Sequence, residues 1–147
     1  MRILVLSDSH GRVGLIQDII EKESFDKIIF LGDGLKDFDY VEQENIIKIA
    51  GNCDLFSTEI KESMFAVDGI KILATHGHLH KVKLGLWSLL HYAKEKNIAL
   101  ILYGHTHTQK EDNLDNIIFV NPGSVANGKY SLIEIVNGKI KVEMKSI

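Results

Sequence analysis

The sequence predicts an α/β fold, and three observations lead to it. Several short apolar runs rich in β-branched residues are typical of buried strands. The first two runs, residues 2–6 and 27–31, flank a segment with helical periodicity, which predicts a strand, helix, strand unit with a right-handed crossover. Later runs are joined by Asp68-Gly69 and Asn137-Gly138, pairs that favour two-residue hairpin turns. The fold is therefore expected to contain antiparallel as well as parallel strands.

The individual elements follow from the same patterns. Val13, Ile16, Ile19 and Ile20 recur at helical spacing, so residues 12–23 are predicted to form an amphipathic helix. Further helices are predicted over residues 84–97 and, as a short stretch, near residues 35–42. The predicted strands cover residues 2–6, 27–31, 46–49, 63–67, 70–74, 98–103, 117–120, 131–136 and 139–144.

Length and composition limit the number of domains, the location and the kinds of partner that the protein can have. A chain of 147 residues fits one domain, predicted here over residues 1–147, and its 45% hydrophobic and 25% charged residues are typical of a globular protein. The single Cys53 cannot form an internal disulfide, which fits a reducing compartment. We find neither a signal peptide nor an apolar run near the ~20 residues of a spanning helix, so a cytoplasmic location without membrane association is expected. A net charge of -3 with two arginines argues against long nucleic acid as a partner.

Asp33 marks the most informative stretch of the chain. An apolar strand ends at this aspartate, which stands between Gly32 and Gly34. The carboxyl ends of strands are where open α/β sheets place their ligand crevices. An ordinary turn would also fit these residues, so the other polar clusters must decide between the two.

Five segments share one pattern, in which a short apolar strand is followed by Asp, Asn or His. Each of them alone also fits a loop or a turn, but four of the seven histidines fall in these places. The predicted ligand side chains are Asp8, His10, Asp33, Asn52, His76, His105 and His107.

These side chains indicate a metal site. Imidazole, carboxylate and amide oxygen suit divalent ions, with manganese as the first candidate and nickel, iron, cobalt or zinc as alternatives. Seven ligands are too many for one ion, whereas two ions about 3.5 to 4 Å apart would use them all, with Asp33 as the bridge. Such a site, with a bridging hydroxide, keeps about one positive charge. It therefore predicts hydrolysis of a phosphate ester by attack of that hydroxide.

The motif set resembles that of the calcineurin-like metallophosphoesterases. The motifs are Asp8-Ser9-His10, Gly32-Asp33, Gly51-Asn52, His76 and Gly104-His105-Thr106-His107. The closing Asn121-Pro122-Gly123-Ser124 is similar to that of the small single-domain prokaryotic phosphodiesterases of this family. The resemblance implies a two-sheet β-sandwich flanked by helices, with four αββα layers. It also implies one metal held by Asp8, His10, Asp33 and His107, and a second held by Asp33, Asn52, His76 and His105.

One position departs from the family pattern. Many members carry a histidine directly after the motif Asn, where it is proposed to protonate the leaving group, but this chain has Cys53. The predicted catalytic residues are Asp33, Asn52 and His78; an exposed loop position is the alternative for His78. Structural or surface positions are expected for His80 and His91. Cys53 is expected to be a small, semi-buried residue that fills space and not a nucleophile.

The sequence thus predicts a metal-dependent phosphodiesterase acting on small phosphate esters. The alternative is a catalytically weak metal-binding scaffold or a protein-interaction module with the same fold, since the family includes a retromer subunit of this kind. The oligomeric state is left open, a homo-oligomer included.

Overall fold

The computed structural model describes all residues, 1–147. It contains ten strands, two α-helices and four short 3-10 helices. In chain order they are β1 (Arg2–Leu6), α1 (Val13–Lys22), β2 (Lys27–Phe30), η1 (Leu35–Tyr40), β3 (Ile46–Lys48), β4 (Glu62–Val67), β5 (Ile70–Thr75), η2 (His78–His80), η3 (Val82–Leu84), α2 (Trp87–Lys96), β6 (Leu100–Leu102), β7 (Lys110–Leu114), β8 (Ile117–Asn121), η4 (Val125–Asn127), β9 (Lys129–Val136) and β10 (Lys139–Ser146).

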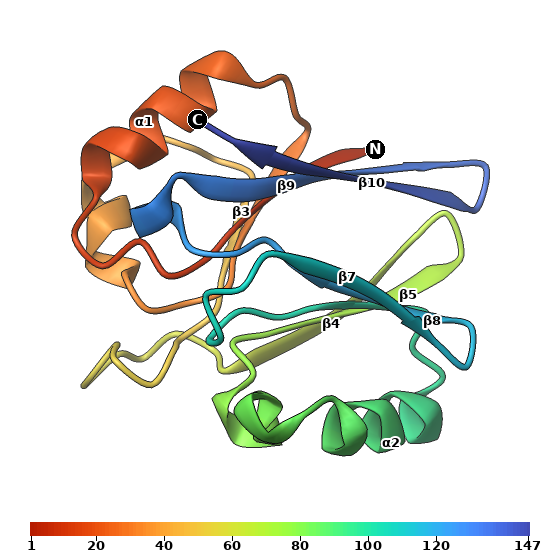
Figure 1. Cartoon of the computed structure of the whole chain (residues 1–147). Coiled ribbons are helices and arrows are strands. Elements are labelled where there is room, and N and C mark those ends of the chain that lie inside the picture. Colours follow the sequence, from red (N-terminus) through yellow and green to blue (C-terminus); the bar gives the residue numbers. More distant parts are fainter.

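The strands form two five-stranded sheets that face each other (Figure 1). The first sheet has the order β10-β9-β1-β2-β3, and the second has the order β4-β5-β6-β8-β7. Strands β1, β2 and β3 are parallel, as are β5, β6 and β8, whereas the hairpin strands pair antiparallel. The predicted strand, helix, strand unit and both predicted hairpins are present.

The two faces of the first sheet bury different residues, because side chains alternate along a strand. Ile3 and Val5 of β1 face the second sheet and pack in the central core with Ile72 and Leu102. The alternate residues of β1 pack against α1 on the outer face.

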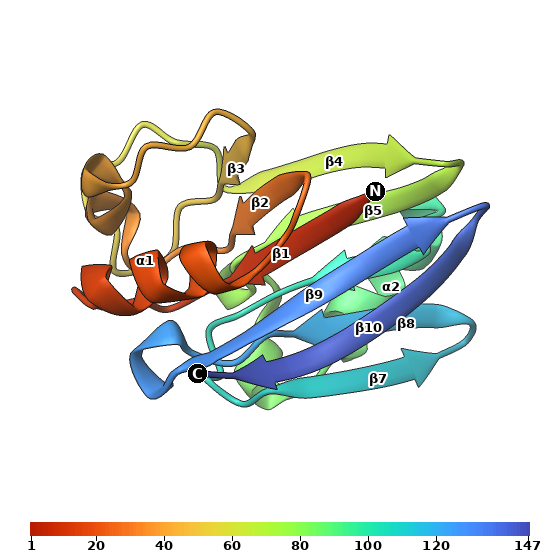
Figure 2. The same cartoon turned by 90° about the horizontal axis from the view of Figure 1, so that it is seen from above.

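Helix α2 covers the outer face of the second sheet in the same way, through Leu89 and Ala93 (Figure 1). In the view from above, α1 lies in front of the sheets and α2 behind them (Figure 2). The layers are thus helix, sheet, sheet and helix. The predicted fold class, an α/β two-sheet β-sandwich flanked by helices, is confirmed.

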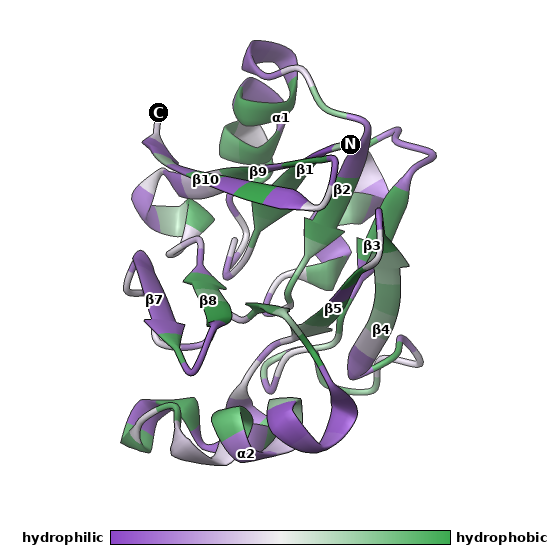
Figure 3. Ribbon diagram, turned by 90° about the vertical axis from the view of Figure 1, so that its right-hand side faces the viewer, coloured by the Kyte–Doolittle hydropathy of each residue, from purple (hydrophilic) through white to green (hydrophobic).

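One strand was not predicted. Strand β7 has the sequence KEDNL and lies at the edge of the second sheet, where most of its residues are exposed. An edge strand of this kind buries little, so it carries no apolar alternation for a sequence pattern to detect, and its charges protect the edge from pairing with another chain. Figure 3 shows its hydrophilic colouring beside the more hydrophobic β8.

Other differences concern the helices. The short helix expected near residues 35–42 is the 3-10 helix η1, and the helix expected over residues 84–97 begins only at Trp87. The left-handed conformation of Asn97 ends α2. No helix of the chain combines the length and the apolar character that crossing a membrane requires.

Candidate metal centre

The loops that follow the parallel strands bring six of the seven predicted ligands into two clusters. Within each cluster the potential ligand atoms all lie within 4.8 Å of one another. The first cluster contains Asp8, His10 and His107, and the second contains Asp33, His76 and His105. The seventh predicted ligand, Asn52, places its Oδ1 atom 3.0 Å from Nε2 of His76.

The first cluster is built around the fully buried carboxylate of Asp8. Its Oδ1 atom lies 3.0 Å from Nε2 of His107 and 3.8 Å from Nε2 of His10. Its Oδ2 atom accepts hydrogen bonds from the Ser7 hydroxyl and from the backbone N–H of His105, the latter at 3.1 Å. Because Oδ2 is held in this way, Oδ1 is the atom that points into the cluster.

The second cluster is oriented by His76, whose side chain is fully buried. Its Nδ1 atom donates to the carbonyl of Leu31 at 2.7 Å, which directs Nε2 towards the other ligands. Nε2 lies 3.3 Å from Oδ2 of Asp33 and 3.2 Å from Nδ1 of His105. The same Asp33 oxygen is 4.0 Å from Nε2 of His10, so Asp33 lies between the clusters.

The residues of both clusters fit divalent ions. Asp8 Oδ1 is buried and has no hydrogen-bond partner. In each cluster two imidazole nitrogens face each other, at 3.3 Å for His10 and His107 and at 3.2 Å for His76 and His105. A cation between such groups would satisfy the orphaned oxygen and both ring nitrogens, and carboxylate with imidazole is a ligand set that suits borderline divalent metals.

The charges of the second cluster also favour a cation. Burial alone would raise the pKa of the Asp33 carboxyl, but hydrogen bonds with His76 and with the N–H of Cys53 hold this pKa well below its ordinary value. Burial alone would lower the pKa of His76, but Asp33 and Asp8 raise it above its ordinary value. The Asp33 carboxylate therefore stays ionised and attracts positive charge.

Several ligand loops have a strained backbone. Five of the predicted ligands have positive φ angles, which are uncommon for residues other than glycine. They are Asp8 at 54°, His10 at 43°, Asp33 at 59°, His105 at 69° and His107 at 59°. Residues in this conformation cluster at functional sites, where the surrounding structure holds them.

Asp54 holds the loop of Asp33, and the sequence interpretation assigned it no role. Its carboxylate accepts backbone N–H groups from Asp33 at 2.7 Å, from Gly34 and Leu35 at 2.9 Å each, and from Gly51 at 2.8 Å. Gly51 is required here because a Cβ atom at this position would overlap the Asp33 carboxylate. The signal in the sequence is weak, since an aspartate three residues after a glycine also occurs in ordinary turns.

The Asn-Pro-Gly-Ser segment supports the first cluster from the other sheet. The Ser124 hydroxyl donates to the carbonyl of Asp8 at 2.7 Å. The Asn121 amide donates to the carbonyl of Gly104 at 3.0 Å and to the hydroxyl of Thr106 at 2.9 Å. These bonds fix the loop between β6 and β7, from which His105 and His107 project.

The comparisons with known proteins agree with this geometry. The family model described as the calcineurin-like phosphoesterase superfamily domain matches residues 1–137. The chain belongs to this superfamily. It is 34% identical over 128 residues to a probable metallophosphoesterase, YsnB of Bacillus subtilis (strain 168), an alignment that covers 85% of this chain and 75% of the relative. It is 28% identical over 149 residues to the phosphodiesterase MJ0936 of Methanocaldococcus jannaschii, with 84% of this chain and 83% of the relative covered.

Solved structures share the fold. A predicted phosphoesterase from Streptococcus pneumoniae superposes with a TM-score of 0.84 at 26% identity, covering 99% of this chain and 88% of the other. Vps29 of Entamoeba histolytica in complex with zinc has a TM-score of 0.78 at 19% identity, with 99% of each chain covered. The predicted family and its sandwich fold are confirmed.

The remaining histidines of this phosphoesterase chain lie in different surroundings. His78 is half-buried, its ring centroid is 5.4 Å from that of His76, and its Nδ1 atom has no hydrogen-bond partner. Burial and the neighbouring His76 lower the pKa of His78. His80 is paired with Glu62 at 2.9 Å, and the exposed His91 is 3.3 Å from Glu95 on the same helix. Neither His80 nor His91 belongs to a metal cluster.

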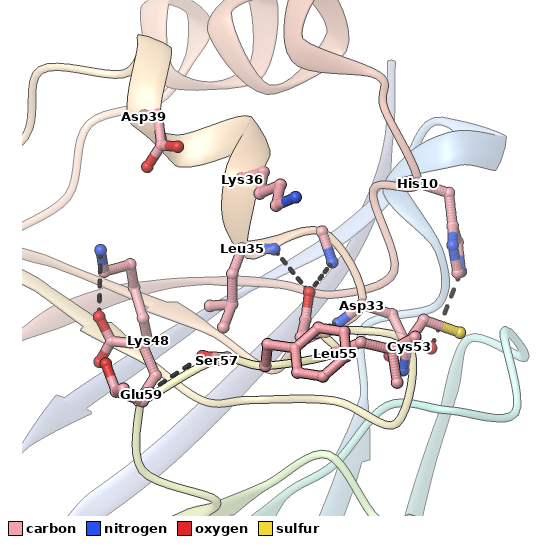
Figure 4. A pocket seen from close by; sticks show the side chains of 14 residues that line it. His10, Asp33, Leu35, Lys36, Asp39, Lys48, Cys53, Leu55, Ser57 and Glu59 are labelled. Carbon is pink, nitrogen blue, oxygen red and sulfur yellow. Dashed lines mark hydrogen bonds and ion pairs between the residues drawn. The ribbon is translucent and has the colours of Figure 1, made fainter.

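A groove opens beside the two clusters. It has a volume of about 770 Å³ and lies between η1 and the loop of residues 53–59 (Figure 4). His10 and Asp33 line one end of it. Cys53 is exposed within this groove, so the filling role expected for it is wrong. Partial burial of its thiol together with the charge of Asp33 raises the pKa of the thiol. A raised pKa keeps the thiol protonated near neutral pH, which argues against a nucleophilic role.

Proposed function

We propose that the protein is a metal-dependent phosphodiesterase that hydrolyses small phosphate esters. The observation that carries the proposal is the pair of His and Asp clusters joined by Asp33, at the strand ends of a calcineurin-like phosphoesterase fold. The phosphodiesterase named among the relatives supports this substrate class. The proposed ligands are Asp8, His10, Asp33 and His107 for one ion, and Asp33, Asn52, His76 and His105 for the other.

Divalent ions held by these residues, with manganese proposed first, would lower the pKa of water to supply the nucleophile and would neutralise charge on the phosphate. The side chains then define where the reaction takes place. Asp33 would join the two ions from its place between the clusters, and Asn52, beside His76, would complete the second site next to the phosphate. In the hydrolysis one phosphorus–oxygen bond forms to the water oxygen and the ester bond breaks, and the departing oxygen takes up a proton.

The surroundings of the site favour an anionic substrate. Lys61 is close enough to His78, and Lys83 close enough to His105, for their charges to contribute to the lowered pKa values of these histidines. Two cations therefore lie in the neighbourhood of the second cluster. They attract a phosphate ester to the site.

We assign His78 to the leaving-group side of this site. Its Nδ1 atom lacks a partner, and Gly77 before it has a positive φ of 108°, which turns the chain after His76. Cys53 stands where the family's usual acid is found, so His78 is the imidazole left for the departing oxygen. Acid assistance is worth about 10²- to 10⁴-fold for a poor leaving group and much less for a good one.

The leaving group therefore tests this assignment. His78→Ala is expected to reduce hydrolysis of an alkyl diester by about 10²-fold or more, and of a nitrophenyl diester distinctly less. Equal losses on both substrates would make His78 a contact of the phosphate. A large loss confined to alkyl diesters in Cys53→Ala would overturn the assignment.

A single experiment tests the proposed function. The protein is stripped of metal, manganese, nickel, iron, cobalt and zinc are added back one at a time, and a panel of monoesters and diesters is assayed. We expect diesters to be hydrolysed, with the highest activity in manganese. His76→Ala, purified in parallel, controls for contaminating phosphatases. Metal binding without turnover of any ester would instead support the scaffold function.

The cytoplasmic location of the protein stays a prediction.

A further inference from the structure

The groove beside the metal clusters has two walls that belong to different parts of the chain. Leu35 and Lys36 of η1 line one side, and residues 53–59 line the other (Figure 4). The groove begins at Asp33 and His10, so a molecule whose phosphate lies at the clusters has its organic part beside or inside the groove. Its volume of about 770 Å³ lies in the range of small-molecule sites.

Apolar side chains stand exposed in this groove. Leu55 is 71% exposed and Phe56 is 102% exposed, although both are large and apolar. Phe56 also has a φ of +62°, a backbone conformation that is strained for a bulky residue. A strained, fully exposed aromatic side chain beside a catalytic site indicates a role in binding.

Four carboxylates and two ammonium groups line the groove, and one of these carboxylates belongs to the metal clusters. The Lys48 ammonium pairs with Glu59 at 3.4 Å. The carboxylate of Asp54 is taken up by four backbone N–H groups. Lys36 and Asp39 remain, one cation and one anion. A groove of this composition suits an uncharged group and does not suit a chain of further phosphates.

We propose that this groove, given the phosphodiesterase function proposed above, binds the flat aromatic group of a small nucleotide diester. Phe56 stacks on the base, Leu55 adds apolar contact, and the phosphate lies at the Asp33 end. Aromatic side chains stack on nucleobases regardless of their identity, since every base offers a flat face. The groove thereby selects small nucleoside diesters over aliphatic ones without distinguishing one base from another.

The test compares two substrates that differ only in the base. These are a 2′-deoxynucleoside 5′-methyl phosphate and the 1,2-dideoxyribose 5-methyl phosphate that lacks the base, with methanol release measured in each case. In wild-type protein kcat/KM is expected to be about tenfold higher for the nucleoside ester. Phe56→Ala is expected to bring this ratio close to one, and Phe56→Tyr to restore it. Trp87→Ala, which removes an exposed aromatic residue outside the groove, should leave the ratio unchanged.

A binding measurement separates this proposal from the proposed function. Saturation-transfer NMR with the metal-free protein detects contact with the two intact esters in the absence of turnover. We expect strong transfer to the base protons in wild-type protein and its loss in Phe56→Ala. If neither ester is hydrolysed with any metal, the proposed function fails. The binding measurement still decides whether the groove binds the base. A ratio and a transfer signal that Phe56→Ala leaves unchanged would overturn the proposal.

Discussion

Asp33 is the residue on which both clusters depend. Its Oδ2 atom lies 3.3 Å from Nε2 of His76 in one cluster and 4.0 Å from Nε2 of His10 in the other. Its Oδ1 atom accepts the N–H of Cys53 at 2.8 Å, which fixes the orientation of the carboxylate. By contrast, His107 is 44% exposed and lies within ligand distance of the first cluster alone.

These positions predict different effects of two substitutions. Asp33→Asn is expected to weaken both metal sites together, because it replaces the shared anionic ligand by a neutral amide. His107→Ala is expected to weaken one site and leave the other near its wild-type affinity. Calorimetric titration of manganese into the stripped protein counts the ions, and His91→Ala, which changes an exposed histidine outside both clusters, is the control. Two ions held with wild-type affinity by Asp33→Asn would refute the bridging assignment.

At the scale of elements, the site depends on the hydrogen bonds that connect the segment after β3 to the segment after β2. Asp54 belongs to the loop after β3, but three of the four N–H groups that it accepts belong to the segment after β2, two in the loop and one at the first residue of η1. The carboxylate therefore connects the ends of two strands next to Asp33. A buried N–H group that loses its acceptor costs about 1–3 kcal/mol.

Removing this tie should destabilise the protein. Asp54→Ala is expected to lower the free energy of unfolding by about 3 kcal/mol, because water replaces only part of the lost hydrogen bonding at this half-buried position. It should also weaken metal binding, since Asp33 loses its support. Urea unfolding of the metal-free protein measures the first effect, with the exposed Asp39→Ala as the matched control. A loss no larger than that of Asp39→Ala would show that the tie is dispensable.

The elements also show where sequence reasoning succeeds. The unit β1, α1, β2 and the hairpins at Asp68-Gly69 and Asn137-Gly138 were predicted, because each rests on local periodicity or turn chemistry. The predicted ligands could be found because each follows a buried strand. Asp54 and β7 could not, since three of the four partners of Asp54 are backbone groups about twenty residues away in the chain and β7 lacks an apolar alternation.

At the scale of the whole molecule, Glu23 connects the outer helix to the sheet. Its carboxylate accepts the Tyr130 hydroxyl of β9 at 2.7 Å and the Lys145 ammonium of β10 at 3.0 Å. Burial raises the pKa of Glu23, but Tyr130 and Lys145 together lower it below its ordinary value of 4.5. The side chain is only 5% exposed, so solvent weakens these interactions little.

This shift predicts how stability depends on pH. A carboxyl whose pKa is lowered in the folded state adds stability above its unfolded pKa, and this stability is lost as the pH falls through the folded value. Glu23→Gln should therefore be less stable than wild type by about 1–2 kcal/mol at pH 7, with a smaller difference at pH 3. Urea unfolding of the metal-free proteins at both pH values measures the difference. Glu21→Gln, an exposed position on the same helix, should show little effect at either pH; a Glu23→Gln deficit that is constant with pH would contradict the linkage.

The four-layer arrangement could be predicted from the family resemblance but not from periodicity. Periodicity identifies which residues of a strand are buried, but both faces of β1 are buried, one against the second sheet and one against α1. Such a strand reads as a continuous apolar run and does not reveal what covers each face. That residues 1–147 form a single domain stays a prediction.

The charge of the whole molecule limits the size of the substrate that it can bind. Long nucleic acid binds through many phosphate contacts, whereas this chain has a net charge of -3, two arginines and a groove with four carboxylates and two lysines. Rate constants for a small diester and for single-stranded DNA or RNA of about 50 nucleotides, compared per phosphodiester bond, are expected to favour the small diester at least tenfold. The binding of long polyanions falls steeply with salt because counterions are released, while one phosphate at the site releases few. Activity on the small diester should therefore change little between 50 and 200 mM salt. Efficient degradation of the long chain that falls steeply over this range would mean that a cationic track outside the groove binds nucleic acid.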